Sequence, residues 1–176
     1  FDFIDHSLAE KKPFFLWYAP FMPHTPHTPP QRLFDKYKAK GIESDHVARY
    51  YAMVEWFDET CGQLLKRLEE KGLKENTLVV YVADNGWIQN PGQKDRPAPR
   101  SKLTPYEGGV RTPIMVSWPG RVPVRLDSEH LASNVDLWPT LAALLRLPLP
   151  PGLPGLNLTD AAAVASRRSV YGEQYA

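Results

Sequence analysis

Proline limits what this chain can fold into more than any other residue. The 176 residues include 18 prolines, roughly twice the usual share of about 5%. They cluster at 13–30, 91–105, 113–123 and 148–154. Because proline lacks a backbone N–H and fixes φ, such clusters exclude helix interiors and central strands. We therefore expect the protein to have long and stiff loops.

The apolar patterns along the chain predict strands that alternate with helices. Continuous apolar runs at Phe14–Ala19, Thr77–Ala83 and Pro113–Trp118 are typical of buried strands. Between the first two runs, apolar residues recur every three or four positions from Val47 to Leu68, which predicts a long amphipathic helix. A strand, a helix and a strand with short connections indicate a βαβ unit. We expect an α/β fold with a mostly parallel sheet flanked by helices, incomplete in this chain.

Capping residues mark the ends of the predicted helices. Ser44 is expected at the N-cap of the long helix and Gly72 just beyond its last turn. A second helix is predicted over 133–147, because Ser133 and Asp136 form a capping-box pattern.

Composition excludes several classes of protein. With 21 Lys and Arg against 20 Asp and Glu, the net charge of +1 excludes the basic excess expected of a nucleic-acid binder. The apolar runs are too short to span a membrane. The single cysteine, Cys61, excludes an internal disulfide framework and a zinc site with several cysteines. The opening residues show neither a Met nor signal-peptide features, so we expect a piece of a longer protein.

Polar residues follow the predicted strands at the positions where open α/β sheets bind ligands. The first strand leads to His24 and His27 in a proline-rich loop, and the second leads to Asp84 and Asn85. The next loop carries Lys102. Two histidines, an acid, an amide and a lysine are therefore expected at one rim of the sheet.

Each of these residues has more than one interpretation. The oxygens of Asp84 and Asn85 suit a hard cation such as Ca²⁺ or Mg²⁺, whereas Asp-Asn-Gly is also a common turn. Two ligands are too few for either ion, so others would have to come from elsewhere. His24 and His27 could pack within their loop, although an imidazole at a strand end can also transfer protons or bind an anion. An isolated lysine such as Lys102 is most often solvated.

Taken together, four segments resemble the type I sulfatases of the alkaline-phosphatase superfamily. In chain order they are PFFLWYAP…PHTPHTPP, YYAMVEWFDETCGQLLKRLEEKGLKENTLVVYVADNG, SKLTPYEGGVRTPIMVSWPG and SNVDLWPTLAALL. The resemblance implies a sulfatase core and the hydrolysis of sulfate monoesters to an alcohol and sulfate. It makes residues 1–147 the C-terminal portion of the catalytic domain, and residues 148–176 a proline-rich exit and the start of a C-terminal subdomain.

The resemblance also implies roles for individual residues. Asp84 and Asn85 match the Asp-Asn pair with which the family holds a calcium ion. His24 matches an active-site histidine, and Lys102 matches the lysine that contacts the sulfate oxygens and the leaving-group side.

Substrate contacts are expected from three further residues. His27 lies just beyond His24, while Trp87 and Arg100 lie in the loop 87–100. A Trp, a Gln and an Arg in that loop suit a carbohydrate, and the expected substrate is a sulfated small molecule or a sulfated carbohydrate. The family resemblance by itself favours a secreted or periplasmic protein.

The sequence departs from the family pattern at the nucleophile. The family uses a formylglycine made from Cys or Ser in a Cys-x-Pro-Ser-Arg motif, which is absent here, and Cys61 falls at a core position of the long helix. Two further metal-binding aspartates are also expected before Phe1. We therefore expect this chain to require an N-terminal half, which would supply the nucleophile and the other calcium ligands, and to be inactive alone.

Two alternatives remain open at this point. The first is a phosphodiesterase, a phosphonate hydrolase or a phosphoethanolamine transferase of the same superfamily. Such enzymes need more histidine and carboxylate ligands for two metal ions, whereas Asn85 directly after Asp84 favours one hard cation. The second alternative is a non-catalytic module that binds anionic sugars. The presence of His24 and Lys102 beside the Asp-Asn pair favours the enzyme.

Overall fold

The structure is a computed structural model that describes residues 1–93 and 96–172. The chain forms two compact units. Unit 1 comprises Phe1–Thr77 and Trp87–Ser101, and unit 2 comprises Leu78–Gly86 and Lys102–Ala176. The segment Trp87–Ser101 is therefore part of unit 1 even though the residues on both sides of it belong to unit 2.

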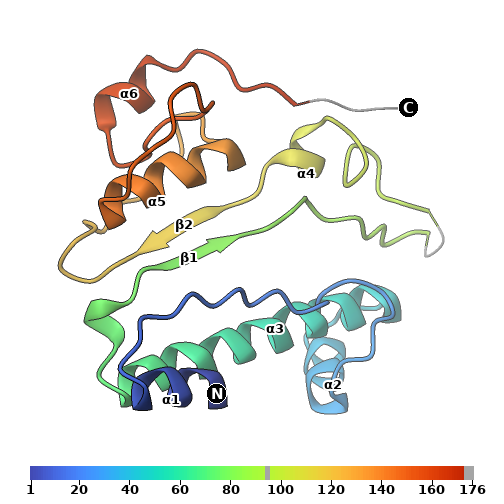
Figure 1. The fold of residues 1–176 in the computed structure, drawn as a ribbon. Helices are drawn as coiled ribbons and strands as arrows, with labels where there is room; N and C mark the ends of the chain where they lie inside the picture. The colour runs from blue at the N-terminus through green and yellow to red at the C-terminus, as the bar shows by residue number, and fades with distance from the viewer. Residues whose placement is uncertain (94–95, 173–176) are drawn as a thin grey trace. The chain divides into compact units, whose positions relative to one another are not determined.

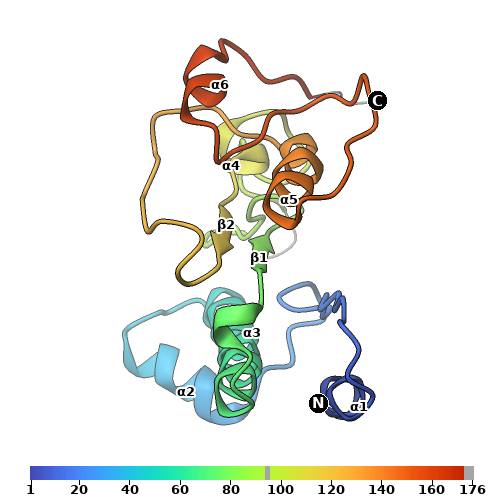
Figure 2. The same cartoon turned by 60° about the vertical axis from the view of Figure 1, so that its left-hand side comes forward.

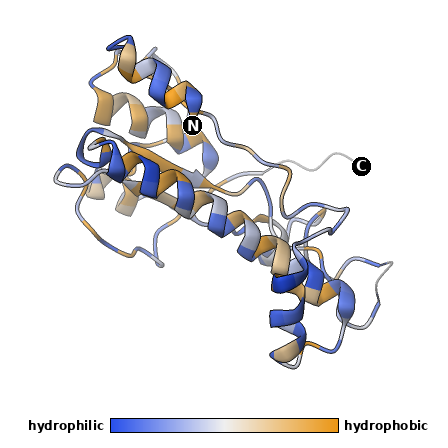
Figure 3. Cartoon of the chain, turned by 90° about the horizontal axis from the view of Figure 1, so that it is seen from below, coloured by the Kyte–Doolittle hydropathy of each residue, from blue (hydrophilic) through white to orange (hydrophobic). Residues whose placement is uncertain are grey.

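Unit 1 is built on the long helix α3 (Asp45–Glu70), which confirms the predicted amphipathic helix. Hydrophilic and hydrophobic residues both occur along this helix (Figure 3), and its buried residues include Val47, Ala52 and Leu68. Gly72 follows the helix with a left-handed φ of 67°, as predicted. Ser44 occupies the N-cap position, but its hydroxyl makes no capping hydrogen bond. No helix among the described residues has the length and the apolar character that crossing a membrane requires.

Two shorter helices complete the helical part of unit 1. Helix α1 (Asp2–Ala9) is tied to α3 by an ion pair between Asp5 and Arg67. Helix α2 (Gln31–Ala39) packs against α3 (Figure 2) and was not predicted. It directly follows the proline-rich loop and buries only Leu33, so its apolar pattern is weak.

The predicted buried strand at Phe14–Ala19 does not form. The segment has no assigned secondary structure, and the side chains of Phe15 and Trp17 are 79% and 77% exposed. A strand is stabilised by hydrogen bonds to a neighbouring strand, and no described residue provides that neighbour. Apolar composition alone therefore misidentified this segment.

Unit 2 contains a small antiparallel sheet instead of the predicted parallel one. Strands β1 (Val79–Val82) and β2 (Ile114–Ser117) form at the predicted places, but they run in opposite directions (Figure 1). Val79 pairs with Ser117 and Val82 pairs with Ile114. The predicted βαβ unit required a parallel partner at Phe14–Ala19. Without it, the regular structure of the described residues is mostly helical, with one two-stranded sheet.

The second predicted helix of the chain is present and opens as expected. A short 3₁₀ turn, Asn134–Asp136, leads into α5 (Leu137–Leu145), and Ser133 and Asp136 form the predicted capping box. The fully buried Asp136 carboxylate also accepts the backbone N–H of Leu156 at 2.7 Å and pairs with Arg167 at 2.5 Å. These bonds attach the start of α5 to residues on both sides of the last helix, α6 (Ala161–Ser166).

Candidate functional site

The turn Asp84–Gly86 follows β1 directly and is fastened to the short helix α4 (Glu107–Val110). The Gly86 N–H donates to the Gly109 carbonyl at 2.8 Å. A Cβ on Gly86 would lie 2.0 Å from the Gly108 carbonyl oxygen, so only glycine allows this close approach. Two glycines of the Tyr-Glu-Gly-Gly segment thus hold the turn that carries Asp84 and Asn85.

Asp84 and Asn85 present oxygens that suit a hard cation. The Asp84 side chain is exposed, whereas Asn85 is half-buried. The Oδ1 atom of Asn85 is buried and has no hydrogen-bond partner among the described residues. Buried carbonyl oxygens are rarely left unpaired, and an amide oxygen beside a carboxylate is a ligand set that Ca²⁺ accepts.

These two ligands can form only part of a metal site. Calcium takes about six to eight oxygen ligands. The part of the chain that the structure describes contains no group of three or more His, Cys, Asp and Glu side chains that could hold a metal ion. Asp84 and Asn85 therefore fit as one portion of a coordination sphere.

Lys102 also belongs to unit 2, in the loop that leads into α4. Its side chain is half-buried and makes no ion pair with another described residue. The neighbouring carboxylate of Glu107 pairs instead with Arg111 at 3.1 Å. The Lys102 ammonium can therefore form an ion pair with a bound anion.

His24 lies in the proline-rich loop of unit 1, and its side chain is exposed. Its Nδ1 atom lies 2.9 Å from the Thr25 carbonyl oxygen. Because a carbonyl oxygen only accepts, this contact assigns the proton to Nδ1 and leaves Nε2 as the acceptor of the neutral ring. Contact with the Phe21 ring, at 4.8 Å between centroids, orients the imidazole further.

His27 has a more protected environment than His24. Its ring is half-buried and lies 5.8 Å from the ring of Tyr50 on α3. Burial lowers the pKa of His27, and the nearby His24 and His46 lower it further, against the opposing effect of a hydrogen bond to the Pro23 backbone. His27 is therefore a neutral imidazole at neutral pH. It can donate or accept hydrogen bonds, but it carries no positive charge.

Trp87 and Arg100 lie at opposite ends of one loop, of which residues 94–95 lie outside the described residues. The Ala98 N–H donates to the Ile88 carbonyl at 3.0 Å and closes the base of the loop. Trp87 is 49% exposed, and Arg100 is exposed with a left-handed φ of 56°. That backbone conformation costs a non-glycine residue about 1–2 kcal/mol, so packing must hold it in place.

The seven predicted site residues divide between the two units. Asp84, Asn85 and Lys102 belong to unit 2, whereas the two histidines and the two ends of the loop belong to unit 1. Sequence reasoning did not recognise that Gly86 and Gly108 approach each other, although the glycines themselves were a visible signal.

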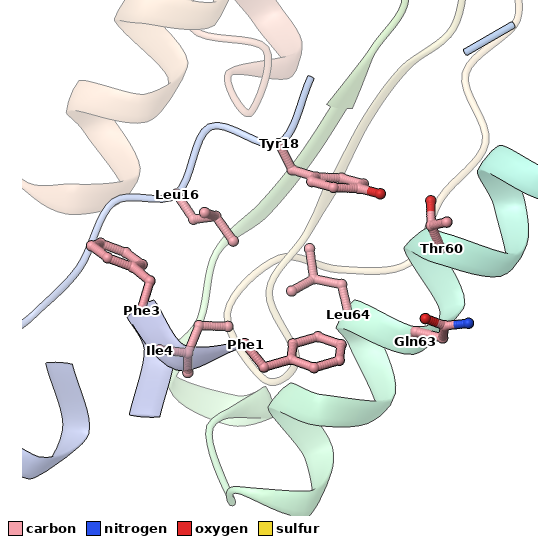
Figure 4. A pocket seen from close by; sticks show the side chains of 8 residues that line it. All are labelled: Phe1, Phe3, Ile4, Leu16, Tyr18, Thr60, Gln63 and Leu64. Carbon is pink, nitrogen blue, oxygen red and sulfur yellow. The ribbon is translucent and has the colours of Figure 1, made fainter. Parts of the chain in front are cut away.

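An apolar pocket of about 300 Å³ in unit 1 is separate from these residues. It lies among α1, the segment 14–19 and α3 (Figure 4). Its lining residues are Phe1, Phe3, Ile4, Leu16, Tyr18, Thr60, Gln63 and Leu64. None of these side chains is charged at neutral pH, so the pocket does not suit an anion.

Neither of two nucleophile-like positions fits that role. Burial raises the pKa of the half-buried Cys61 thiol in α3, which disfavours the reactive thiolate. The segment Ser117–Arg121 has the spacing Ser-x-Pro-x-Arg. Ser117, however, ends β2 opposite Val79, and the Arg121 guanidinium lies 4.5 Å from the Trp118 ring. This segment is therefore a strand end followed by a turn.

Comparison with known proteins gives one consistent result. The family model described as Sulfatase matches residues 1–147. The chain is 36% identical to a sulfatase of Formosa agariphila over 92% of its length, and 36% identical to arylsulfatase A of Homo sapiens over 85%. It is also 34% identical to N-acetylgalactosamine-6-sulfatase of Canis lupus familiaris over 91%. The chain spans 31%, 28% and 30% of the lengths of these three relatives, respectively.

Solved structures agree with the sequence matches. The crystal structure of Ps i-CgsB superposes with a TM-score of 0.78 at 32% identity and covers 91% of this chain and 36% of that one. The same protein has been solved in complex with k-i-k-neocarrahexaose. The PsFucS1 sulfatase from Pseudoalteromonas sp. superposes with a TM-score of 0.67 at 29% identity and covers 93% of this chain and 32% of that one.

Proposed function

This chain belongs to the sulfatase family, and from that premise we propose that the protein carrying it hydrolyses sulfate monoesters. The reaction adds water to RO–SO₃⁻ and yields ROH and sulfate. The rest of such a protein would supply the nucleophile, because this chain spans about a third or less of its relatives and lacks the Cys-x-Pro-Ser-Arg motif.

One observation in particular supports this proposal. The Asn85 Oδ1 atom is buried and unpaired among the described residues, beside the exposed Asp84 carboxylate. Gly86, which admits no side chain, fixes the turn that carries both groups. A simple turn would not need a buried oxygen without a donor, whereas a cation site would use it.

Sulfatases typically use a metal ion and a formylglycine, and here we propose that Asp84 and Asn85 contribute to holding Ca²⁺. A bound cation of this kind supplies positive charge next to the sulfate oxygens and the reacting centre. The residues of this chain would provide a carboxylate and an amide oxygen, and the remaining ligands would come from the rest of the protein.

Lys102 is proposed to stabilise negative charge as the ester bond breaks. A sulfate ester gains charge on its bridging oxygen in the transition state, and a fixed ammonium stabilises that charge most when it is greatest. The absence of an ion pair between Lys102 and any described residue leaves its charge uncompensated for this purpose.

His24 is proposed to exchange a proton or a hydrogen bond with the substrate through Nε2. In the neutral ring the Thr25 carbonyl holds the proton on Nδ1, so Nε2 is left as a hydrogen-bond acceptor. The exposure of the ring allows a substrate to reach this atom.

A sulfated carbohydrate is the proposed substrate class. Relatives of this chain include N-acetylgalactosamine-6-sulfatases, and a structural relative has been solved with a carrahexaose. The exposed Trp87 and Arg100 could contact a sugar face and an anionic group, respectively.

The experiment is to measure sulfate release and calcium binding in the intact protein for three variants. Asp84→Ala should abolish most sulfate release and weaken calcium binding, while Asp58→Ala, which alters an exposed aspartate on α3, should change neither. Asn85→Ala should weaken calcium binding less than Asp84→Ala, because it removes a neutral ligand. In calcium-free buffer Asn85→Ala should not lower the thermal midpoint, because it removes a buried oxygen that lacks a partner.

Two outcomes would contradict the proposal. Unchanged calcium affinity in both site variants would leave Asp84–Gly86 as a turn only. Faster hydrolysis of phosphate diesters than of sulfate esters by the wild-type protein would favour the phosphodiesterase alternative.

A further inference from the structure

We propose that His46 is a positioning residue that latches the loop 87–101 to helix α3 and thereby sets how Trp87 and Arg100 meet a sulfated carbohydrate. The statement about the substrate rests on the proposed function. The statement about the latch rests on unit 1 alone.

The latch consists of two hydrogen bonds to the His46 ring. Its Nε2 atom lies 2.7 Å from the Asn90 carbonyl oxygen, and its Nδ1 atom lies 2.8 Å from the Ser44 hydroxyl. Because the carbonyl oxygen only accepts, Nε2 must donate, and the Ser44 hydroxyl then donates to Nδ1. Both ring nitrogens of a neutral imidazole are satisfied in this way, so the ring is held in one orientation.

Asn90 is the residue around which the far part of the loop turns. Its carbonyl oxygen also accepts the Gln93 N–H at 3.2 Å, and its side-chain oxygen accepts the Gly92 N–H at 3.1 Å. The bond from His46 spans 44 positions in the sequence and attaches this turn to the first turn of α3. The loop is thus held at its turn by His46 and at its base by the Ala98–Ile88 bond.

The two exposed ends of the loop, Trp87 and Arg100, lie next to the hydrogen bond at its base. Trp87 comes one residue before the base bond, and Arg100 comes two residues after it. The fully buried Ser101 donates its hydroxyl to the Ala98 carbonyl at 2.6 Å and fixes the exit from the loop. We infer that releasing the turn would loosen this base as well, and would so change where Trp87 and Arg100 are presented.

Ser44 provides independent support for the latch. It occupies the N-cap position of a 26-residue helix, yet its side chain accepts no backbone N–H of that helix. Serine at this position normally caps the helix. Here the hydroxyl is bonded to His46 instead, so helix capping does not explain its orientation.

The test compares three variants of the intact protein with a matched control. His46→Ala removes the donor to Asn90, and His46→Gln keeps an N–H at a similar reach. Ser44→Ala removes only the bond to Nδ1. The control is His6→Ala, which alters an exposed histidine of α1. The measurements are hydrogen exchange of peptides covering 87–101, KM for a sulfated oligosaccharide, and kcat for nitrophenyl sulfate.

His46→Ala should accelerate exchange in 87–101 while peptides from β2 keep their protection. Loss of one hydrogen bond should raise KM for the oligosaccharide about fivefold, with kcat for nitrophenyl sulfate unchanged because this small substrate does not need the loop. His46→Gln should restore most of both properties, Ser44→Ala should give a smaller change in the same direction, and His6→Ala should behave as wild type.

Each contrary outcome has a distinct meaning. Unchanged exchange in His46→Ala would overturn the latch. Faster exchange with an unchanged KM would overturn the role of the loop in binding carbohydrate. If the wild-type protein released no sulfate from any ester, the proposed function would fail, while the exchange data would still support or overturn the latch.

Discussion

At the scale of single residues, the charges that hold the fold differ from those proposed for chemistry. Asp5 and Asp136 each contact an arginine, and Glu59 of α3 pairs with Arg32 of α2. Asp84 and Lys102, in contrast, have no ion-pair partner among the described residues. A charged group without an ion-pair partner in the chain remains available to a ligand. Substitution of Asp84 or Lys102 should therefore affect ligand binding or catalysis more than stability.

Lys102→Ala in the intact protein should lower kcat by roughly 10²–10³, the usual cost of losing one fixed donor to a developing anion. The deficit should shrink for esters with good leaving groups such as nitrophenol, because these need less stabilisation. Steady-state kinetics on a series of aryl sulfates provides the measurement, and Lys66→Ala on the exposed face of α3 serves as the control. A lysine that only attracts anions would instead change kcat/KM modestly and with strong salt dependence.

His27 should contribute to the dependence of stability on pH. Burial lowers the pKa of His27 in the folded protein, and the nearby His24 and His46 lower it further. The folded state therefore binds fewer protons than the unfolded state, so stability is present above the unfolded pKa of about 6.5 and is lost as the pH falls. Thermal midpoints between pH 7.5 and 5 should fall less steeply for His27→Gln than for wild type. An equal slope for His27→Gln would show that burial does not perturb this group.

At the scale of elements, the contact between the Asp84–Gly86 turn and α4 is the one that most tightly restricts the sequence. Gly86→Ala would place a methyl group 2.0 Å from the Gly108 carbonyl oxygen. Overpacking of this kind costs about 1–3 kcal/mol, and it would also displace Asn85. We expect a lower thermal midpoint together with weaker calcium binding.

Gly62→Ala is the matched control for this substitution. Gly62 lies within α3 and is exposed, and a methyl group added there would meet nothing within 4 Å. Alanine is favoured over glycine in a helix by about 1 kcal/mol, so this variant should be more stable than wild type and should bind calcium normally. Equal effects of Gly86→Ala and Gly62→Ala on the thermal midpoint would show that the close approach of the two backbones is absent in solution.

At the scale of the whole molecule, we do not expect this chain alone to hydrolyse sulfate esters, although it belongs to the sulfatase family. The chain spans 28–31% of its curated relatives and lacks the Cys-x-Pro-Ser-Arg motif. The purified 176-residue chain should therefore release no sulfate from an aryl sulfate above the buffer rate, with or without calcium. Metal-dependent turnover by this chain, measured against its Asp84→Ala variant, would show that a nucleophile is present here after all.

Local patterns in the sequence determined the type and position of α3, α5, β1 and β2. Apolar spacing placed α3 almost to the residue, and the Ser133 and Asp136 pair identified the start of α5. These features depend on residues within one or two helical turns of each other, so they are visible in the sequence. The four segments that resemble type I sulfatases, taken in chain order, similarly indicated the family, which the comparisons then confirmed.

Only the tertiary structure decided which distant segments meet. Apolar composition does not state which strand is the neighbour or its direction, so the antiparallel pairing of β1 with β2 was not predicted. The burial of Asn85 Oδ1, the approach of Gly86 to Gly108 and the bond from His46 to Asn90 likewise depend on the position of backbone groups far away in the chain. The sequence by itself thus determined which chemical groups are available, because these follow from residue type. The tertiary structure determined which of them are buried, paired or left unpaired, because hydrogen bonds and close contacts form only between groups that the folded chain brings together.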